Sequence, residues 1–362
     1  MNTLRRPGPA KIAAGALAQY PDRLDVRSPS EFALDHLPGA VNLPVLDDSE
    51  RALVGTIYAH ESAFAAKKRG AALVARNIAH IVDMHCRDRP REWSPVVYCW
   101  RGGQRSAALA HVLHEIGFQV AQLAGGYQAY RRHVVAALAR LPVRFTFVVV
   151  CGLTGAGKSR LLAALAGIGA QVLDLEGLAK HRGSLLGDLP HEPQPSQKAF
   201  ESQLLAALER FDSKVPVYIE SESRRIGSVQ MPEALLAAMR ASNCVRIDTP
   251  HALRVALLKE EYQHFLGDPD SLSAKLARLE PLFGPAVVAD WANVAAAGGF
   301  DSLVAELLRK HYDPTYSRSM EKNFPRSLSA HRVVPEAIDG ETFRALAREI
   351  DAQVGESIVV PA

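Results

Sequence analysis

Short apolar runs alternate with amphipathic stretches along the N-terminal third of the chain. Runs at 23–26, 95–99 and 118–123 predict short strands, because each is brief, apolar and bounded by turn-forming residues. Apolar residues at helical spacing predict helices over 106–116 and from 128 onward. Strands that alternate with helices are typical of a parallel α/β sheet.

A second set of apolar runs begins near residue 145. The run 145–151 includes three consecutive valines and predicts a buried strand, with a helix starting at Lys158. The same alternation continues to residue 312 and predicts a second parallel α/β sheet. Further strands are predicted over 171–175, 215–219 and 244–247, and further helices over 251–266 and 300–312.

These patterns predict two α/β domains with parallel sheets, joined at the basic, proline-containing segment 131–144. A long Ala-rich stretch interrupts the first domain and reads as helical. Beyond residue 312 the chain becomes polar and basic, and it ends in a predicted acidic helix near 340–354. The predicted parts are an N-terminal extension (1–15), a first domain (16–138) with a helical insertion near 49–90, a linker (139–145), a second domain (146–312) and a C-terminal tail (313–362).

Charge is concentrated where the two motifs described below lie. The 362 residues carry a net charge of only +3. Between Trp93 and Leu173, however, Glu115 is the only acidic residue, against eight arginines and lysines. Such an excess is typical of a site that handles phosphates or RNA, although solvated arginines at helix ends would give the same count.

Cysteine usage and hydropathy exclude several classes of protein. Cys86, Cys99, Cys151 and Cys244 show no paired spacing, which argues against a zinc site and against a secreted disulfide framework. The N-terminus has no apolar core typical of a signal peptide, and no run reaches the length of about 18 apolar residues typical of a membrane span. We therefore expect a cytoplasmic protein that does not enter a membrane.

The most informative cysteine is Cys99, which ends a predicted strand just before a predicted helix. Backbone N–H groups at a helix N-terminus favour a thiolate. Glycines let the loop curl so that its N–H groups point inward and hold an anion. A buried, inert cysteine that closes a strand is the alternative. The candidate anion-binding residues of this loop are Arg101, Gly102, Gly103, Arg105 and Ser106.

Three further stretches accompany this loop: Asp25-Val26-Arg27, residues 36–44 with the sequence HLPGAVNLP, and Gly125-Gly126-Tyr127. Together with the Cys99 loop they resemble the rhodanese family over residues 16–138. The resemblance implies that Cys99 accepts a chalcogen atom as a covalent, persulfide-type adduct. The insertion near 49–90 departs from a minimal rhodanese; it either covers a large substrate or serves as scaffold.

The second motif is the sequence GLTGAGKS at 152–159, which fits the pattern G-x-x-x-x-G-K-[ST] between a predicted strand and a predicted helix. In such a phosphate-binding loop (P-loop) the backbone amides surround a phosphate, the lysine reaches its outer oxygens, and the hydroxyl can hold Mg²⁺. The motif predicts recognition of a diphosphate but does not by itself predict ATP hydrolysis. The candidate diphosphate-binding residues are Gly152, Thr154, Gly155, Gly157, Lys158 and Ser159.

Four carboxylates follow predicted strands of the second domain. Asp174 and Glu176 lie where an acceptor or metal could be bound, and capping of a helix is the alternative. The strand over 215–219 is followed by Glu220 and Glu222 in place of the aspartate expected for a nucleotide-hydrolysing P-loop protein. We regard all four as candidate metal or acceptor carboxylates.

The combination of the two motifs resembles one family across most of the chain, the bacterial tRNA 2-selenouridine synthases. The matching stretches are 98–106, 152–159, 174–184, 220–227 and 312–316. The resemblance implies conversion of wobble 2-thiouridine in a tRNA anticodon loop to 2-selenouridine. It implies selenophosphate as the selenium donor, geranyl diphosphate as the donor for an S-geranylated intermediate, and a selenophosphate-producing enzyme as a partner. Mg²⁺ at the P-loop would assist the departure of diphosphate.

RNA contact is expected from basic and aromatic residues near the junction and the tail. Solvated basic residues and core tyrosines are the alternative for each. The candidates are Arg131, Arg132, Arg144, Tyr312, Tyr316 and Arg318.

Two other functions fit the same motifs. A sulfurtransferase fused to a small-molecule kinase would hydrolyse ATP in step with phosphorylation of a small acceptor, and would not need RNA. A non-catalytic binding protein that keeps the rhodanese fold would have an unreactive Cys99 thiol.

Overall fold

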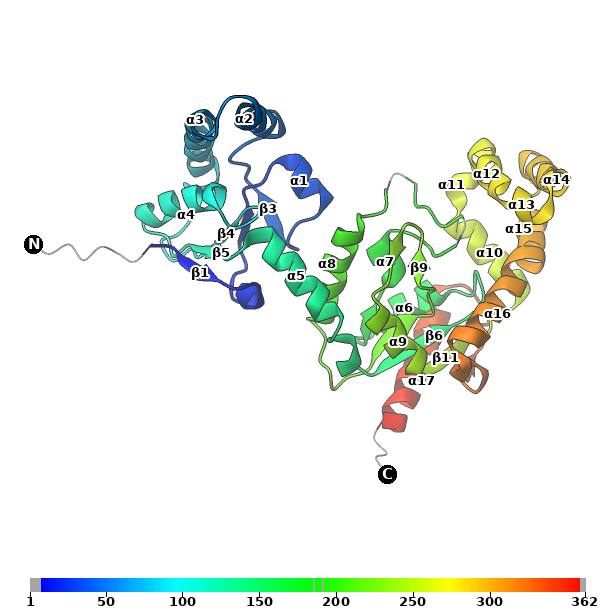
Figure 1. The fold of residues 1–362 in the computed structure, drawn as a ribbon. Helices are drawn as coiled ribbons and strands as arrows, with labels where there is room; N and C mark the ends of the chain where they lie inside the picture. Colours follow the sequence, from blue (N-terminus) through cyan, green and yellow to red (C-terminus); the bar gives the residue numbers. More distant parts are fainter. Residues whose placement is uncertain (1–7, 185, 191, 359–362) are drawn as a thin grey trace, which may run out of the picture. The chain divides into compact units, whose positions relative to one another are not determined.

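A computed structural model describes residues 8–184, 186–190 and 192–358. It divides the chain into two compact units (Figure 1). The first unit consists of residues 1–137 and 195–206, and the second of 138–194 and 207–362. No helix among the described residues is long and apolar enough to cross a membrane.

The first unit is built on a five-stranded parallel sheet with the order β1-β5-β4-β2-β3. The central strand β4 is buried along its whole length, which explains why its sequence is uninterrupted by polar residues. Predicted strands and helices of this domain are confirmed. The strands are β1 (Ala10–Ile12), β2 (Arg23–Asp25), β3 (Ala40–Asn42), β4 (Val96–Tyr98) and β5 (Ala121–Leu123), and the helices around them are α1 (Pro29–Leu34), α4 (Gln104–Ile116) and α5 (Gly126–Leu138).

The predicted insertion forms two consecutive helices, α2 (Asp48–His60) and α3 (Ala63–Ile81), followed by a π-helical turn. Each begins at a side chain that accepts a backbone N–H, Asp47 for α2 and Ser62 for α3. Helix α3 buries Ile78 and other apolar residues in the core of the unit, whereas α2 has no buried residue. The outer helix α2 is therefore held by its packing against α3.

The second unit contains another five-stranded parallel sheet, with the order β12-β11-β6-β8-β7. Strand β6 lies at its centre and leads directly into the P-loop. The strands are β6 (Phe147–Cys151), β7 (Gln171–Leu173), β8 (Val217–Glu220), β11 (Asn243–Ile247) and β12 (His331–Val333), with a separate hairpin of β9 (Arg225–Ile226) and β10 (Val229–Gln230).

Helices cover this sheet and extend beyond it. Those near the sheet are α6 (Lys158–Gly167), α7 (Leu175–Ala179), α9 (Glu233–Ala241) and α17 (Gly340–Ile358). The others are α10 (His251–Glu261), α11 (Gln263–Leu266), α12 (Pro269–Leu276), α13 (Glu280–Phe283), α14 (Pro285–Ala296), α15 (Phe300–Leu307) and α16 (Asp313–Asn323). Several of these helices, α12 to α15 among them, share an apolar core that includes Trp291.

Three predicted domain boundaries need correction. The N-terminal extension 1–15 includes β1, which pairs with β5 at the edge of the first sheet; residues 1–7 lie outside the described residues. The C-terminal tail 313–362 is part of the second unit, because β12 extends its sheet and α17 packs against α6. Phe343, Ala347 and Ile350 of α17 recur at helical spacing and are buried in the same core as α6.

The third correction concerns helix α8 (Gln197–Leu208), which was expected within the second domain. Residues 195–206 belong to the first unit. Ser202 Oγ donates to Asp35 Oδ2 at 3.2 Å, and Ser196 Oγ donates to the carbonyl of Leu34 at 2.6 Å. The chain therefore leaves the second unit and returns to it, contributing one helix to the first unit.

Candidate functional site

The thiol of Cys99 lies at the C-terminal end of β4, only 4% exposed. The backbone N–H of Gly103 and the Oγ of Ser106 both donate to its Sγ, at 3.3 and 3.2 Å. Ser106 is held in turn by Gln122, whose Nε2 donates to the Ser106 Oγ at 2.8 Å. Two donors therefore point at one sulfur, an arrangement that stabilises a thiolate or an anionic adduct on it.

Two glycines let this loop pass close to the start of α5. Gly102 has φ +64°, and a Cβ on it would lie 2.6 Å from the carbonyl oxygen of Leu123. Gly126 has φ +55°, and a Cβ there would collide with the backbone of Cys99. The close approach lets the Tyr127 N–H donate to the Cys99 carbonyl at 2.8 Å. Larger residues at either glycine would push the loop away from α5.

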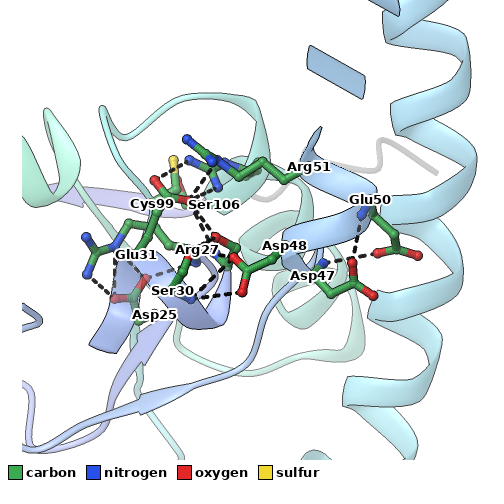
Figure 2. Close-up of polar contacts among 12 residues, drawn as sticks. Asp25, Arg27, Ser30, Glu31, Asp47, Asp48, Glu50, Arg51, Cys99 and Ser106 are labelled. Carbon is green, nitrogen blue, oxygen red and sulfur yellow. Dashed lines mark hydrogen bonds and ion pairs between the residues drawn. The ribbon is translucent and has the colours of Figure 1, made fainter. Parts of the chain in front are cut away.

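The arginines of the loop have different surroundings. Arg101 is exposed, and its contact with an anionic substrate stays a prediction. Arg105 donates to Glu31 at 2.8 Å. Glu31 also pairs with Arg51 of the insertion helix α2, at 3.2 Å, and Figure 2 shows Arg51 reaching toward this group from a different helix. Burial acts to raise the pKa of Glu31, but the two arginines outweigh it and lower that pKa.

Sequence reasoning missed Arg51, because nothing local to the insertion indicates that its first helix approaches Glu31. Two guanidinium groups share one carboxylate beside the Cys99 loop. Asp48 also interacts with Arg51, so the two arginines are balanced by two carboxylates, and an anionic substrate would be met by guanidinium N–H groups rather than by a net positive charge.

A buried ion pair supports the strand next to β4. Asp25 and Arg27 are 0% and 1% exposed, and Arg27 Nη2 donates to Asp25 Oδ2 at 2.6 Å. The guanidinium also lies over the ring of Tyr127, 4.1 Å from its centroid. The Asp25-Val26-Arg27 stretch is thus structural, and it holds β2 and α5 around the cysteine loop.

Replacing Arg27 with alanine should destabilise the protein by about 3–5 kcal/mol, because it leaves the Asp25 carboxylate buried without its partner. Urea unfolding of both variants measures the change. The matched control is Arg76→Ala, which breaks an ion pair with Glu50 whose arginine is 68% exposed and should cost less than about 1 kcal/mol. Equal losses of unfolding free energy in the two variants would contradict the structural role assigned to the buried Asp25–Arg27 ion pair.

In the second unit, the predicted P-loop joins β6 to α6. Gly155 and Gly157 have φ +74° and +86°, and a Cβ on Gly157 would lie 2.6 Å from the Phe343 ring. Lys158 is 8% exposed and donates to the carbonyl of Gly152 at 3.3 Å. The P-loop residues line a cavity together with residues that follow β7.

The four candidate carboxylates have separate roles in the structure. Asp174 caps α7 by accepting the Gly177 N–H at 2.8 Å, as the capping alternative predicted. Glu176 accepts from the Ser159 hydroxyl at 3.1 Å. Glu220 accepts the Glu176 N–H at 2.7 Å and is fully buried, which raises its pKa. Burial, and then the nearby Glu176, raise the pKa of Glu222 to about 8.

The oxygen donors near the P-loop determine whether this site could hold a metal ion. Among the described residues, no cluster of three or more histidine, cysteine or acidic side chains could hold a metal ion. Mg²⁺ is ordinarily held by one or two protein oxygens together with phosphate oxygens and water. Ser159 and Glu176 fit that role and would hold the ion only alongside a bound diphosphate. Mg²⁺ at this place would neutralise charge on the bound phosphate oxygens.

A narrow apolar cavity adjoins the P-loop cavity and was not predicted. The two cavities share Thr154, Ser184, Leu258 and Tyr262. The buried Thr154 hydroxyl has no hydrogen-bond partner among the described residues, so it is available to a ligand at this junction. Other residues that line the apolar cavity include Phe265, Leu272, Leu303, Leu307 and Tyr312.

The candidate RNA-contacting residues are only partly on the surface. Arg131 is ion-paired with Glu201 and lies near Asp35, with 12% of its side chain exposed. Tyr312 is 7% exposed in the wall of the apolar cavity, and the ring of Tyr316 lies 5.6 Å from Lys158 Nζ. Arg131 and Tyr312 are thus largely buried and Tyr316 is partly buried, and RNA contact by these three stays a prediction. Arg132, Arg144 and Arg318 are exposed, and RNA contact by them stays a prediction.

Two family models match the chain. Residues 11–133 match the rhodanese-like domain, and residues 145–269 match the AAA domain of tRNA 2-selenouridine synthase. The first unit is therefore a rhodanese domain and the second a P-loop domain of the AAA type.

Curated proteins called tRNA 2-selenouridine synthase are similar to most of the chain. The protein from Bdellovibrio bacteriovorus is 32% identical over 83% of this chain and 89% of its own length. The protein from Salmonella arizonae is 32% identical over 83% of this chain and 90% of its own length. The protein from Nitrosomonas europaea is 37% identical over 66% of this chain, and the match spans 63% of that relative.

Proposed function

The chain belongs to the tRNA 2-selenouridine synthase family, and from this premise we propose that it replaces the sulfur of wobble 2-thiouridine in a tRNA anticodon loop with selenium. The proposed reaction has two steps. The thiocarbonyl sulfur is first geranylated by geranyl diphosphate at the P-loop. Selenium from selenophosphate then displaces the geranylated sulfur at the Cys99 loop.

The observation that carries the first step is the apolar cavity that adjoins the P-loop cavity. Geranyl diphosphate has a charged end that suits the P-loop cavity and a hydrocarbon end that suits the apolar cavity. Its diphosphate fits the amides of the P-loop and Lys158, and its hydrocarbon chain fits walls of leucine, phenylalanine and tyrosine. The Thr154 hydroxyl lies where the two parts of such a ligand would meet.

The chemistry of the first step follows from these residues. The nucleoside sulfur attacks C1 of the geranyl group, the new C–S bond replaces the C–O bond, diphosphate departs, and the N3 proton of the base is released to solvent. The departing diphosphate gains negative charge, which Lys158 and the loop amides stabilise. Alkylation also turns the thiocarbonyl sulfur into a better leaving group for the second step.

The second step is assigned to the Cys99 loop because its sulfur accepts two hydrogen bonds and arginines lie nearby. Cys99 acts as nucleophile on the donor: its sulfur attacks phosphorus, an S–P bond forms, and the P–Se bond breaks to release selenide. The exposed Arg101, with Arg105 and Arg51 nearby, supplies guanidinium N–H groups for the oxygens of selenophosphate. This donor implies a selenophosphate-producing enzyme as a partner, and the substrate implies action in the cytoplasm.

Nucleoside mass analysis tests this proposal. The purified protein is incubated with 2-thiouridine tRNA, geranyl diphosphate, selenophosphate and Mg²⁺, and the tRNA is then digested. We expect S-geranyl-2-thiouridine without selenophosphate, and 2-selenouridine when both donors are present. Conversion of ATP to ADP in step with phosphorylation of a small acceptor, with no change in the tRNA, would contradict the proposal and favour the kinase alternative.

A further inference from the structure

The helical insertion of the first unit forms a groove that the proposed function has not used. It lies between α2 and α3 and reaches the start of α4, with a volume of about 870 Å³. Small residues keep it open, since five alanines beside Gly55 and Gly70 belong to its lining. Its volume lies within the range of about 300–1,000 Å³ that is usual for small-molecule sites. Larger apolar walls come from Leu46, Val54, Tyr58 and Val74.

One end of this groove meets the Cys99 loop. Gln104 and Arg105 line it, and they directly follow Gly103, whose N–H donates to the Cys99 Sγ. Arg51 also lines the groove and pairs with Glu31 beside the same loop (Figure 2). The groove is thus apolar along its walls and lined by arginines where it reaches the cysteine.

We propose that this groove holds the geranyl chain of the S-geranylated nucleoside while selenium replaces sulfur. The inference rests on the proposed function and names the role of the insertion within it. The chain is attached to the sulfur that must approach Cys99, so an apolar site for it has to begin at the Cys99 loop. The groove of α2 and α3 begins there.

The step that the groove serves balances without an oxidant or reductant. The Cys99 thiolate attacks the phosphorus of selenophosphate, an S–P bond replaces the P–Se bond, and the selenide that is released attacks C2 of the nucleobase. A C–Se bond forms and the C–S bond breaks. Geranylthiolate departs and takes up a proton, and water cleaves the Cys99 S–P bond to release phosphate and restore the thiol. The groove binds the leaving group as well as the substrate, because both carry the same hydrocarbon chain.

The test fills the groove without disturbing the cysteine. Gly55 lies on α2, lines the groove, and has no atom within 4 Å of the place a Cβ would occupy. Gly55→Trp therefore places a large side chain in the groove without a backbone clash. Gly55→Ala controls for the change in helix propensity. Gly15→Trp is the matched control at an exposed glycine, equally free of neighbours, that does not line the groove.

Two anticodon stem-loops serve as probes, one with S-geranyl-2-thiouridine and one with S-methyl-2-thiouridine, each with selenophosphate. Gly55→Trp should lower kcat/KM for the geranyl probe by at least about tenfold, the equivalent of burying about two CH₂ groups. Turnover of the methyl probe should stay unchanged, which also shows that the variant is folded. Ala71→Phe, on the opposite helix α3, should repeat this selective loss.

Two outcomes overturn the inference. Gly55→Trp and Ala71→Phe could lower turnover of both probes equally, in which case the insertion acts on the RNA or on the loop rather than on the chain. They could also leave the geranyl probe unaffected. Failure of the proposed function looks different, because the unaltered protein would then convert neither probe.

Discussion

Cys99→Ser should abolish the formation of 2-selenouridine and leave S-geranylated tRNA to accumulate. Serine keeps the shape of the side chain, but its hydroxyl is far less acidic and far less nucleophilic than a thiol. Loss of the reacting atom should reduce selenium incorporation by at least about a thousandfold. The first step uses the P-loop of the other unit and should proceed at its normal rate. Mass analysis of digested tRNA reports both nucleosides in the same sample.

Cys86→Ser is the matched control for this substitution. Cys86 is also a buried free cysteine of the first unit, packed in its hydrophobic core, and it is not part of the 99–106 loop. Its replacement should leave both nucleosides at normal levels apart from a small loss of stability. Continued selenium incorporation by Cys99→Ser would show that Cys99 does not handle selenium. Loss of geranylation in the same variant would show that the two steps share one site.

The strands and both motifs could be predicted because their signals are local. The apolar run 145–151 becomes the central strand β6, and the glycines after it take the positive φ angles that a phosphate-binding turn needs. The Cys99 loop is likewise determined by local sequence, with a buried strand before it and a helix after it. In both cases a few consecutive residues determine the geometry.

The parts that could not be predicted depend on contacts between distant residues. The acidic helix near the C-terminus was predicted as an element, but its burial against α6 was not, since only the folded chain brings Phe343 and Leu161 into one core. Arg51 reaches Glu31 from a separate helix. For Tyr312 the sequence left two interpretations open, RNA stacking and a core position, and only the folded chain shows that it lines an apolar cavity.

Each unit combines an anion-binding loop with an apolar cavity of its own. The P-loop adjoins the cavity that contains Leu303, and the Cys99 loop adjoins the groove of the insertion. A reaction that moves one hydrocarbon chain from a diphosphate to a nucleoside, and then releases it, needs an apolar site beside both chemical centres. This pairing accounts for two features that a simple sulfurtransferase would not need, the second unit and the insertion.

Lys158→Ala should greatly slow geranylation and leave selenium transfer nearly unchanged. Without its ammonium group, the negative charge that builds on the departing diphosphate loses one stabilising partner. Loss of one such group ordinarily costs about a hundredfold to a thousandfold in rate. Geranylation of 2-thiouridine tRNA should fall by that factor, while selenium transfer to tRNA that is already S-geranylated should stay within about twofold of normal.

Lys214→Ala is the control, because Lys214 is an exposed lysine of the same unit that does not line the cavity. The hydrocarbon half of the site is tested by Val304→Phe, which narrows the apolar cavity. It should raise the KM for geranyl diphosphate and leave binding of inorganic diphosphate unchanged, since only the former has a chain to accommodate. Intact geranylation in Lys158→Ala, together with loss of selenium transfer from S-geranylated tRNA, would place the diphosphate elsewhere and assign the P-loop to the second step.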